Sequence, residues 1–392
     1  MPTIDFTNTE IAFAHLSDKE LKKTAWLFNM MNKPWLVNYG SKLALWAVEN
    51  GIPLAEWAVK KTVFQQFVGG TTLLDSQPSI ERLAAYNTLT ILDYGAEAKE
   101  TELDFNHTMN ENIRAIDFAA RSVKSIPVIS TKVTGLMRFG LLERIQSAET
   151  LTRDEIGEYR NALKRIDAIC YHASKKNVSV FIDAEESWIQ DSIDHLVWLM
   201  MRRYNKQRVV VYNTFQMYRH DRLHFLTESY DRASKEGFML GAKLVRGAYM
   251  EKERARAEEM GYSSPINPDK AATDDLYNTA LRFCLDHLDT LAFCNASHNA
   301  DSALLQVELM DKKGMAHDHP HTLFSQLYGM SDNLTFNLAR AGFRVAKYLP
   351  YGQVKEVIPY LIRRAQENTS VTGDAGRELK MVREEVKRRE RK

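Results

Sequence analysis

The stretch Phe238–Val245 reads FMLGAKLV, and Arg246–Arg254 continues it as RGAYMEKER. A short apolar run followed by a longer polar, helix-forming stretch is typical of a buried strand and its crossover helix. Gly247 and Ala248 follow the run and permit a close approach of the backbone to a planar ring or a phosphate. The alternative is a buried strand that simply ends in a charged turn.

Seven further runs follow this pattern, and they are Leu89–Leu92 (LTIL), Ile126–Thr131 (IPVIST), Val178–Ile182 (VSVFI), Val209–Tyr212 (VVVY), Leu291–Cys294 (LAFC), Leu323–Leu327 (LFSQL) and Phe343–Tyr348 (FRVAKY). Continuous apolar strands separated by helices indicate a parallel sheet that is covered on both faces. Eight of them over roughly 260 residues favour a closed (βα)8 barrel over an open sheet.

The sequence around the predicted barrel divides the chain into three parts. Apolar residues recur at helical spacing up to about Ala85, which predicts an N-terminal helical segment over residues 1–85. We expect the barrel and its last helix over residues 86–370. Residues 371–392 form a charged C-terminal tail, which we interpret as a solvated helix or a frayed end. Its basic surface is a secondary candidate for contact with anionic lipid.

Composition excludes several classes of protein. Fifty-two Lys and Arg against 51 Asp and Glu leave a net charge of +1, so nucleic acid is not an expected partner. Three cysteines without CxxC spacing indicate neither a disulfide framework nor a thiolate zinc site. The start of the chain resembles neither a signal nor a transit peptide, and the apolar runs are far shorter than the roughly 18 residues of a spanning helix. We therefore expect a cytoplasmic protein, with peripheral contact at the inner face of the membrane as an option.

Common cofactor and metal motifs are absent from the sequence. There is no GxGxxG after the first strand, no GxxxxGK[ST], no HExxH and no GxSxG. His317, Asp318, His319 and His321 could in principle ligate zinc. Because Pro320 interrupts them in an expected surface loop and no second cluster completes the ligand set, we expect no metal site.

Polar residues gather at or just beyond the ends of the predicted strands, and they are Asp93, Lys132, Asp183, Gln216, Arg246 and His298, while Lys243 stands within a strand. In a barrel the carboxyl ends of the strands converge at one mouth. Any single one of these residues could instead mark the start of a loop. Seven together favour a functional site.

The last predicted helix follows the stretch YLPYGQ and has two different faces. Val354, Val357, Ile358, Leu361 and Ala365 form an apolar stripe. The other face carries a second set, Tyr360, Arg363, Arg364 and Glu367. An ordinary solvated face with an ion pair explains this second set, but the adjacent arginines and the tyrosine also suit a binding site.

Four motifs together resemble those of the proline dehydrogenase family, and they are KLVRGAYMEKERAR from Lys243, FIDAEES from Phe181, ASHN from Ala296 and KYLPYGQVKEVIPYLIRRAQENTS from Lys347. The motifs occur in the order of that family, and the chain is most similar to its shorter, mitochondrial-type branch. The resemblance implies a (βα)8 barrel that binds FAD at the carboxyl ends of its strands, with the last helix crossing above the flavin.

The resemblance also implies roles for individual residues. Arg363 and Arg364 bind the substrate carboxylate, a geometry that suits a planar guanidinium. Lys132 completes the cationic pocket. Asp183 and Lys243 are the expected catalytic residues, and Asp183 holds the basic groups. The substrate walls are Ala248, Leu327, Tyr348 and Tyr360. The residues expected to bind FAD are Ala184, Gln216, Lys243, Val245, Gly247, Ser297, His298 and Glu367, and Glu97 is a candidate gate that faces Arg363.

The activity implied by the resemblance is oxidation of L-proline to 1-pyrroline-5-carboxylate, with a membrane quinone as the final electron acceptor. Lys243 and Ser297 differ from the arginine and threonine of the bifunctional relatives, which puts the details of flavin orientation in doubt. Two alternatives remain: oxidation of hydroxyproline or an N-methylproline on the same scaffold, and a barrel that has lost its cofactor.

Overall fold

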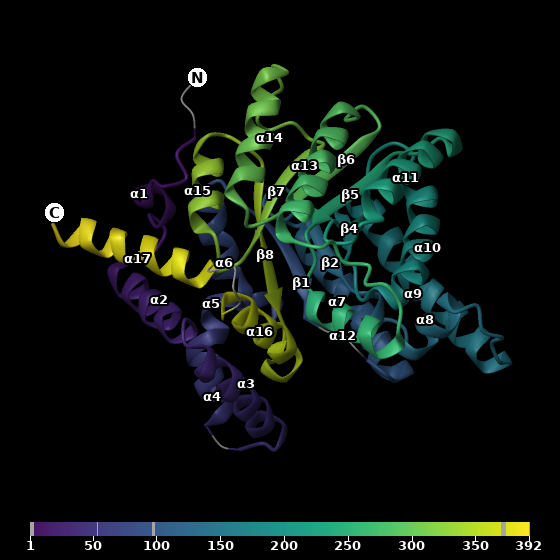
Figure 1. Cartoon of the computed structure of the whole chain (residues 1–392), viewed down its shortest axis with the longest axis horizontal. Helices are drawn as coiled ribbons and strands as arrows, with labels where there is room; N and C mark the ends of the chain where they lie inside the picture. The colour runs from purple at the N-terminus through teal and green to yellow at the C-terminus, as the bar shows by residue number, and fades with distance from the viewer. Residues whose placement is uncertain (1–3, 53, 96–98, 370–373, 392) are drawn as a thin grey trace. The chain divides into compact units, whose positions relative to one another are not determined.

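The computed structural model describes residues 4–52, 54–95, 99–369 and 374–391. Its strands form a closed parallel barrel in which they follow one another in chain order (Figure 1). The strands are β1 (Leu89–Tyr94), β2 (Val128–Thr131), β3 (Ser179–Ile182), β4 (Val211–Gln216), β5 (Leu240–Val245), β6 (Leu291–Ala296), β7 (Thr322–Leu327) and β8 (Val345–Tyr351). The eight strands predicted from the sequence are all confirmed, and the largest difference is β4, which starts later and extends to Gln216.

The strands are apolar runs because they are buried on both sides. Every residue of β2 and of β8 is buried. In β5, Gly241 is required by close packing, since a Cβ atom at this position would lie 2.3 Å from the carbonyl oxygen of Val211. The register places Lys243 of β5 beside Thr214 of β4 and Cys294 of β6. The middle of the sheet is therefore set by backbone pairing and by small residues at close contacts.

The chain separates into two compact units, Met1–Gly95 with Gln326–Lys392 and Ala96–Ser325. The helices of the first unit are α1 (Thr9–Ala12), α2 (Asp18–Met31), α3 (Pro34–Glu49), α4 (Ala55–Val59), the π-helical turn η1 (Lys60–Phe64), α5 (Gln65–Phe67), α6 (Leu73–Ala85), α15 (Asp332–Arg340), α16 (Val354–Thr369) and α17 (Asp374–Glu390). Those of the second are α7 (Glu102–Ala120), the 3-10 turn η2 (Val133–Gly135), α8 (Phe139–Gln146), α9 (Arg153–Lys176), α10 (Ser187–Tyr204), α11 (Arg222–Glu236), α12 (Met250–Met260), α13 (Lys270–Asp286) and α14 (Ala300–Lys312). The three-part division at residues 85 and 370 stays a prediction.

The first unit has a core that joins its N-terminal and C-terminal helices. Phe28 of α2 and Phe67 of α5 pack edge to face in a cluster that also contains residues of α16. Four residues of the stripe predicted for α16 are buried there, namely Val354, Val357, Ile358 and Leu361, and Ala365 packs against them. The stripe is therefore confirmed as the core face of α16.

The C-terminal stretch is a helix with a buried face rather than a fully solvated one. Met381 and Val382 of α17 pack in a cluster with Leu21 of α2, and the two helices lie side by side (Figure 1). Glu385 is fully buried and accepts hydrogen bonds from Arg388 and Arg389. The mixed charges of this stretch suggested a solvated tail, but in α17 the charge of Glu385 is partly neutralised by the two arginines that follow it.

The helices of the second unit begin and end at residues suited to capping. Thr152 and Glu155 form a reciprocal capping box at the start of α9, which ends at Asn177 in the left-handed conformation. Among the described residues, the helices are all too short or too polar to cross a membrane.

Candidate active site

Asp183 is the centre of a cluster of charges at the carboxyl end of β3. Its Oδ1 atom accepts hydrogen bonds from the Ser130 hydroxyl at 2.9 Å and from Lys243 Nζ at 2.5 Å, and its Oδ2 lies 4.0 Å from Lys132 Nζ. The parallel register of β2 with β3 and the position of β5 bring these side chains together, although more than 50 residues separate β2 from Asp183 and β3 from Lys243. Asp183 and Lys243 are buried. The structure thus brings together three of the residues that the sequence assigned to a site.

Glu185 is a second buried acid in this region, and the sequence analysis did not single it out. Its carboxylate accepts hydrogen bonds from the backbone N–H and the hydroxyl of Thr134. Burial raises the pKa of Glu185 to about 7, while the charge of Lys132 and the bonds from Thr134 oppose this rise. The signal was present in the motif FIDAEES, where three acids, Asp183, Glu185 and Glu186, follow a buried strand.

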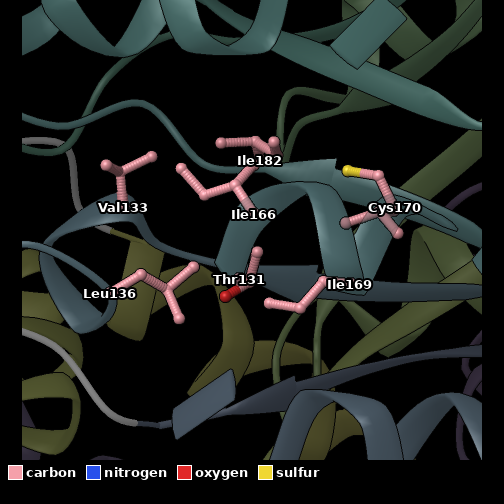
Figure 2. Close-up of a pocket in the computed structure, with 8 residues that line it drawn as sticks. Thr131, Val133, Leu136, Ile166, Ile169, Cys170 and Ile182 are labelled. Atoms are coloured by element: carbon pink, nitrogen blue, oxygen red, sulfur yellow. The ribbon is translucent and has the colours of Figure 1, made fainter. Parts of the chain in front are cut away.

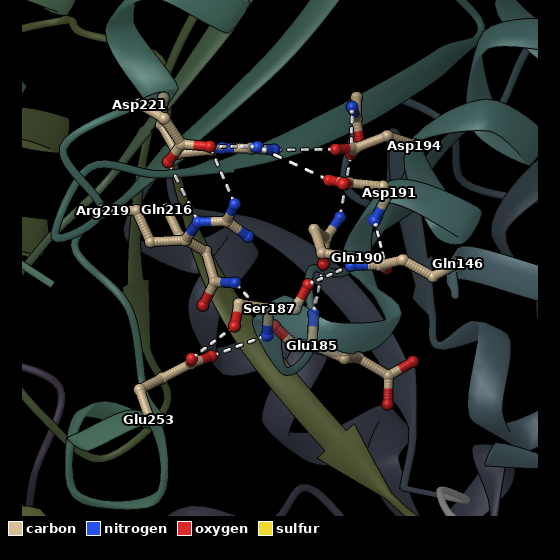
Figure 3. Close-up of polar contacts among 12 residues, drawn as sticks. Gln146, Glu185, Ser187, Gln190, Asp191, Asp194, Gln216, Arg219, Asp221 and Glu253 are labelled. Atoms are coloured by element: carbon tan, nitrogen blue, oxygen red, sulfur yellow. Dashed lines mark hydrogen bonds and ion pairs between the residues drawn. The ribbon is translucent and has the colours of Figure 1, made fainter. Parts of the chain in front are cut away.

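A polar network holds the backbone around Glu185 (Figure 3). Gln190 accepts a hydrogen bond from the Glu185 N–H at 2.7 Å and donates one to Asp194 at 2.9 Å. Asp194 also accepts bonds from Asn213 and from Arg222 at 2.9 and 2.8 Å. Because these groups are buried and satisfied by one another, they fix how the chain leaves β3 and β4.

The ends of β4 and β5 carry several of the predicted FAD-binding residues. Gln216 is buried and donates a hydrogen bond of 2.7 Å to the carbonyl of Glu185, and it pairs in register with Val245. Gly247 has a φ of +134°, and a Cβ atom there would lie 2.5 Å from the ring of Tyr218. Only glycine combines this conformation with this contact.

Arg246 links the end of β5 to the end of β6. Its guanidinium donates hydrogen bonds to Asp274 at 2.8 Å, to the Ser297 hydroxyl at 2.7 Å and to Ser302 at 3.0 Å. The same group lies 4.3 Å from the ring centroid of Tyr277. Arg246 therefore fixes Ser297, a predicted FAD contact, in one orientation. The remaining predicted contacts of this unit differ in exposure: Ala184 is buried, Val245 and His298 are partly buried, and Ala248 is exposed.

The other predicted residues lie in the first unit, on or beside β7, β8 and α16. Tyr348, Tyr360 and Arg364 are buried, whereas Leu327 and Arg363 are partly exposed. The Arg364 guanidinium lies 5.4 Å from the ring centroid of Tyr360. The explanation of this helix face as an ordinary solvated surface is therefore wrong for Tyr360 and Arg364.

Two of the predicted residues cannot be placed. Glu97 lies outside the described residues, and so does the side chain of Glu367, although its backbone belongs to α16. Their roles as a gate and as an FAD contact stay predictions.

The histidines at 317–321 have partners other than a metal ion. His317 lies 2.8 Å from Asp311, and His321 Nδ1 lies 2.6 Å from the carbonyl of Leu288. In the part of the chain that the structure describes, no group of three or more His, Cys, Asp or Glu side chains has the arrangement of a metal site.

A pocket too tight to hold a water molecule lies among β2, β3 and α9, and Figure 2 shows its side chains. Its lining is apolar apart from the hydroxyl of Thr131, with residues such as Ile166, Ile169 and Cys170 around it. None of the predicted site residues lines it. We interpret it as imperfect packing in the core of the second unit.

The donors at the strand ends fit a flavin cofactor by their chemistry. Lys243, Arg246, Gln216 and Ser297 offer ammonium, guanidinium, amide and hydroxyl donors, which suit the carbonyl and nitrogen acceptors of a flavin ring and the negative charge of a pyrophosphate. At Gly247 the backbone carries no side chain and passes directly against Tyr218. These residues are consistent with FAD at the ends of β3 to β6.

Comparisons with known proteins agree with this chemistry. A sequence profile of the family described as proline dehydrogenase matches residues 76–377. Proline dehydrogenase 1, mitochondrial, of Drosophila melanogaster is 38% identical over 241 residues, which cover 59% of this chain and 35% of the fly protein. Hydroxyproline dehydrogenase of Xenopus laevis is 32% identical over 410 residues, covering 95% of this chain and 88% of the frog protein.

A solved structure has the same fold. Proline utilization A from Bdellovibrio bacteriovorus, inactivated by N-propargylglycine, superposes with a TM-score of 0.76 at 18% sequence identity. The superposition covers 94% of this chain and 42% of that one. The chain thus spans well under half of that protein and about a third of the fly protein.

Proposed function

Because this chain belongs to the proline dehydrogenase family, we propose that it oxidises L-proline to 1-pyrroline-5-carboxylate with FAD as its cofactor. The observation that carries the proposal is the buried cluster of Asp183 with Lys243, Lys132 and Ser130 at the ends of the barrel strands. Burying charged groups is costly, and active sites are places where this cost is met, so the cluster supports a functional role for these residues.

The substrate carboxylate is bound by cations in this proposal. Arg363 and Arg364 each offer a planar fork of donors that matches a carboxylate, and Lys132 adds a third positive charge. The walls around the pyrrolidine ring are assigned by the family resemblance alone, and they are Leu327, Tyr348, Tyr360 and Ala248.

The cationic pocket also sets the protonation state of the substrate. A positively charged surrounding lowers the pKa of the proline amine, so it favours the neutral form whose lone pair assists the loss of hydride from C5. FAD supplies the acceptor for that hydride. The nitrogen then loses its proton, and the product has a C=N bond in place of the C–H and N–H bonds that were broken.

Asp183 acts on the ammonium groups rather than on proline. It fixes the position of Lys243, which is expected to donate a hydrogen bond to the flavin. The remaining FAD contacts in the proposal are Ala184, Gln216, Val245, Gly247, Ser297, His298 and Glu367, with Glu97 as a gate. Electrons leave for a quinone in the membrane, which is consistent with a cytoplasmic protein that meets the inner face of the bilayer.

The test is the visible spectrum of the purified protein. We expect a yellow preparation whose flavin absorbance near its long-wavelength maximum is bleached when L-proline is added without oxygen. A colourless protein that FAD cannot reconstitute would support the barrel without cofactor. A yellow protein that L-proline does not bleach would contradict the proposed substrate.

Hydroxyproline is the second candidate substrate, because the frog hydroxyproline dehydrogenase aligns with nearly the whole chain. A pocket that makes no hydrogen bond to the added hydroxyl discriminates only modestly between the two imino acids. Activity on L-proline, trans-4-hydroxyproline and N-methylproline with a dye acceptor separates these readings. A higher kcat/KM for either alternative would reassign the substrate.

A further inference from the structure

Helix α3 exposes a row of large apolar side chains to solvent. The exposed fractions are 63% for Trp35, 75% for Tyr39, 64% for Leu43 and 55% for Trp46. Successive members are four, four and three residues apart, so they lie on one face of the helix. Four neighbouring large side chains of this kind form a surface rather than the scattered exposure that is normal for single residues.

The opposite face of α3 is apolar as well. Val37 and Val48 are buried, and Val48 and Leu45 pack in the core that also contains residues of α16. A helix at the surface of a protein usually has one apolar and one polar face, and a helix that is apolar on both sides needs a second apolar partner. The core of the first unit covers only the inner face of α3, and the outer apolar face remains exposed.

The segment after α3 enlarges this exposed surface. Leu54 is 75% exposed and Trp57 of α4 is 60% exposed, and α3 and α4 pack against each other (Figure 1). We call the six residues the aromatic face, namely Trp35, Tyr39, Leu43, Trp46, Leu54 and Trp57.

Lysines accompany the aromatic face. Lys33 precedes α3, and Lys60 and Lys61 follow α4, and all three are exposed. Residues 33–61 contain four lysines and two glutamates in the sequence. Tryptophan and tyrosine favour the interface between lipid and water, and lysines beside them are attracted to anionic headgroups.

We propose that the aromatic face docks this protein onto the surface of a bilayer that contains anionic lipid. The rings insert among the headgroups and upper acyl chains, and the lysines contact the phosphates. The C-terminal tail is the weaker candidate, because Leu379, Met381 and Val382 of α17 are buried and have no free apolar surface to insert. A second copy of the chain is also less favoured, since the cores of protein interfaces are depleted in lysine.

Vesicle flotation tests the proposal directly. The intact protein is mixed with vesicles of phosphatidylcholine, with or without phosphatidylglycerol, and we expect it to float with the anionic vesicles. The triple variant W35Q/L43Q/W46Q removes three inserting side chains, so its partition coefficient should fall by at least about tenfold. The matched control L103Q/Y171Q changes two similarly exposed residues of the second unit and should bind as the unchanged protein does. Equal binding of the triple variant and the control, or no flotation of the unchanged protein, would overturn the proposal.

Two further measurements keep the result independent of folding and of self-association. The chain has six tryptophans, of which Trp35, Trp46 and Trp57 belong to the aromatic face. Brominated lipids should therefore quench a large part of the tryptophan fluorescence of the unchanged protein, and an absence of quenching counts against insertion. K60Q/K61Q should reduce the preference for anionic vesicles, and an unchanged preference contradicts the role of the lysines.

Sedimentation velocity without lipid tests the alternative that the aromatic face binds a second copy of the chain. A dimer that the triple variant dissociates, in a protein that does not bind vesicles, would assign the aromatic face to a second copy and overturn the proposal. None of these measurements uses turnover, so their outcome is independent of the proposed oxidation of proline.

Discussion

Lys243 Nζ lies 2.5 Å from Asp183 Oδ1, and both side chains are buried, Lys243 within β5 and Asp183 directly after β3. A buried ammonium and a buried carboxylate each lose hydration, so the attraction within the pair offsets part of the cost of burying both. A substitution at either member of the pair should therefore destabilise the second unit.

Removing both partners should cost less than the sum of the two single removals. We expect Asp183→Asn or Lys243→Met to lower the free energy of unfolding by about 3–5 kcal/mol, because each removes one partner of a buried ion pair. The double variant should be less destabilised than the sum of the two, which urea unfolding in a double-mutant cycle measures. Ser130→Ala is the control and should cost about 1 kcal/mol, the value of one hydrogen bond. Additive effects of the two single changes would show that the pair is not coupled.

The paired arginines should control substrate affinity. Arg363→Met and Arg364→Met each remove charge-assisted hydrogen bonds to the proline carboxylate, so KM for proline should rise roughly tenfold to a hundredfold. The flavin content should stay unchanged. Arg340→Met, at an exposed position of α15, is the control for loss of a positive charge. Steady-state kinetics with a dye acceptor checks this, and an unchanged KM in both variants contradicts the clamp.

Gly247 should not tolerate a side chain. Gly247→Ala forces an alanine to a φ of +134° and places its Cβ 2.5 Å from the ring of Tyr218, so we expect a lower melting temperature and loss of bound flavin. Gly237→Ala is a matched control, because this glycine also has a positive φ, +69°, but open space around its Cβ. The control should lose about 1 kcal/mol of stability and keep its flavin. Equal flavin content in the two variants would remove Gly247 from the cofactor site.

Glu185 should make stability depend on pH. Burial raises the pKa of Glu185 from 4.5 to about 7, so below about pH 7 the protonated form is favoured in the folded state. Its contribution to stability is complete below about pH 4.5 and is lost as the pH rises through about 7. Glu185→Gln stays neutral, so its stability relative to the unchanged protein should improve from pH 5 to pH 8. Thermal unfolding across this range, with exposed Glu258→Gln as the charge control, measures the difference. A difference that is constant with pH would contradict the assignment.

The C-terminal helix should contribute to global stability. Leu379→Ala removes a side chain that is buried in the core of the first unit, and we expect a loss of about 2–5 kcal/mol. Lys380→Ala changes the exposed neighbour and should have little effect. Urea denaturation compares the two, and equal midpoints would mean that α17 is the frayed tail that its charges suggest.

Local pattern was enough to find the barrel strands. The predicted run Phe238–Val245 differs from β5 by two residues at its start and ends at the same residue. A short, continuously apolar segment is typical of a strand that is covered on both faces, so the pattern alone identified it. The stripe of α16 was visible for the same reason, since its spacing depends only on helix geometry. Polar residues at strand ends could be grouped because parallel strands end on one side of a sheet.

Other features depended on partners that are distant in the sequence. The motif FIDAEES shows that Glu185 follows a strand, but Thr134 is 51 residues away, so the burial and the raised pKa of Glu185 could not be predicted from the motif. The same holds for α17. Its many charges predict a solvent-exposed helix, and only the packing of Leu21 of α2 against Met381 and Val382 shows that one face is buried.

The amino-acid sequence by itself determined the barrel, the order of its strands and the family, because hydrophobic periodicity and contiguous motifs are properties of neighbouring residues. Only the tertiary structure decided that Asp183 holds Lys243, that Tyr360 and Arg364 are buried, and that the outer face of α3 has no protein partner among the described residues. Burial and desolvation are set by residues far away along the chain, and these two quantities give a charged or aromatic side chain its role.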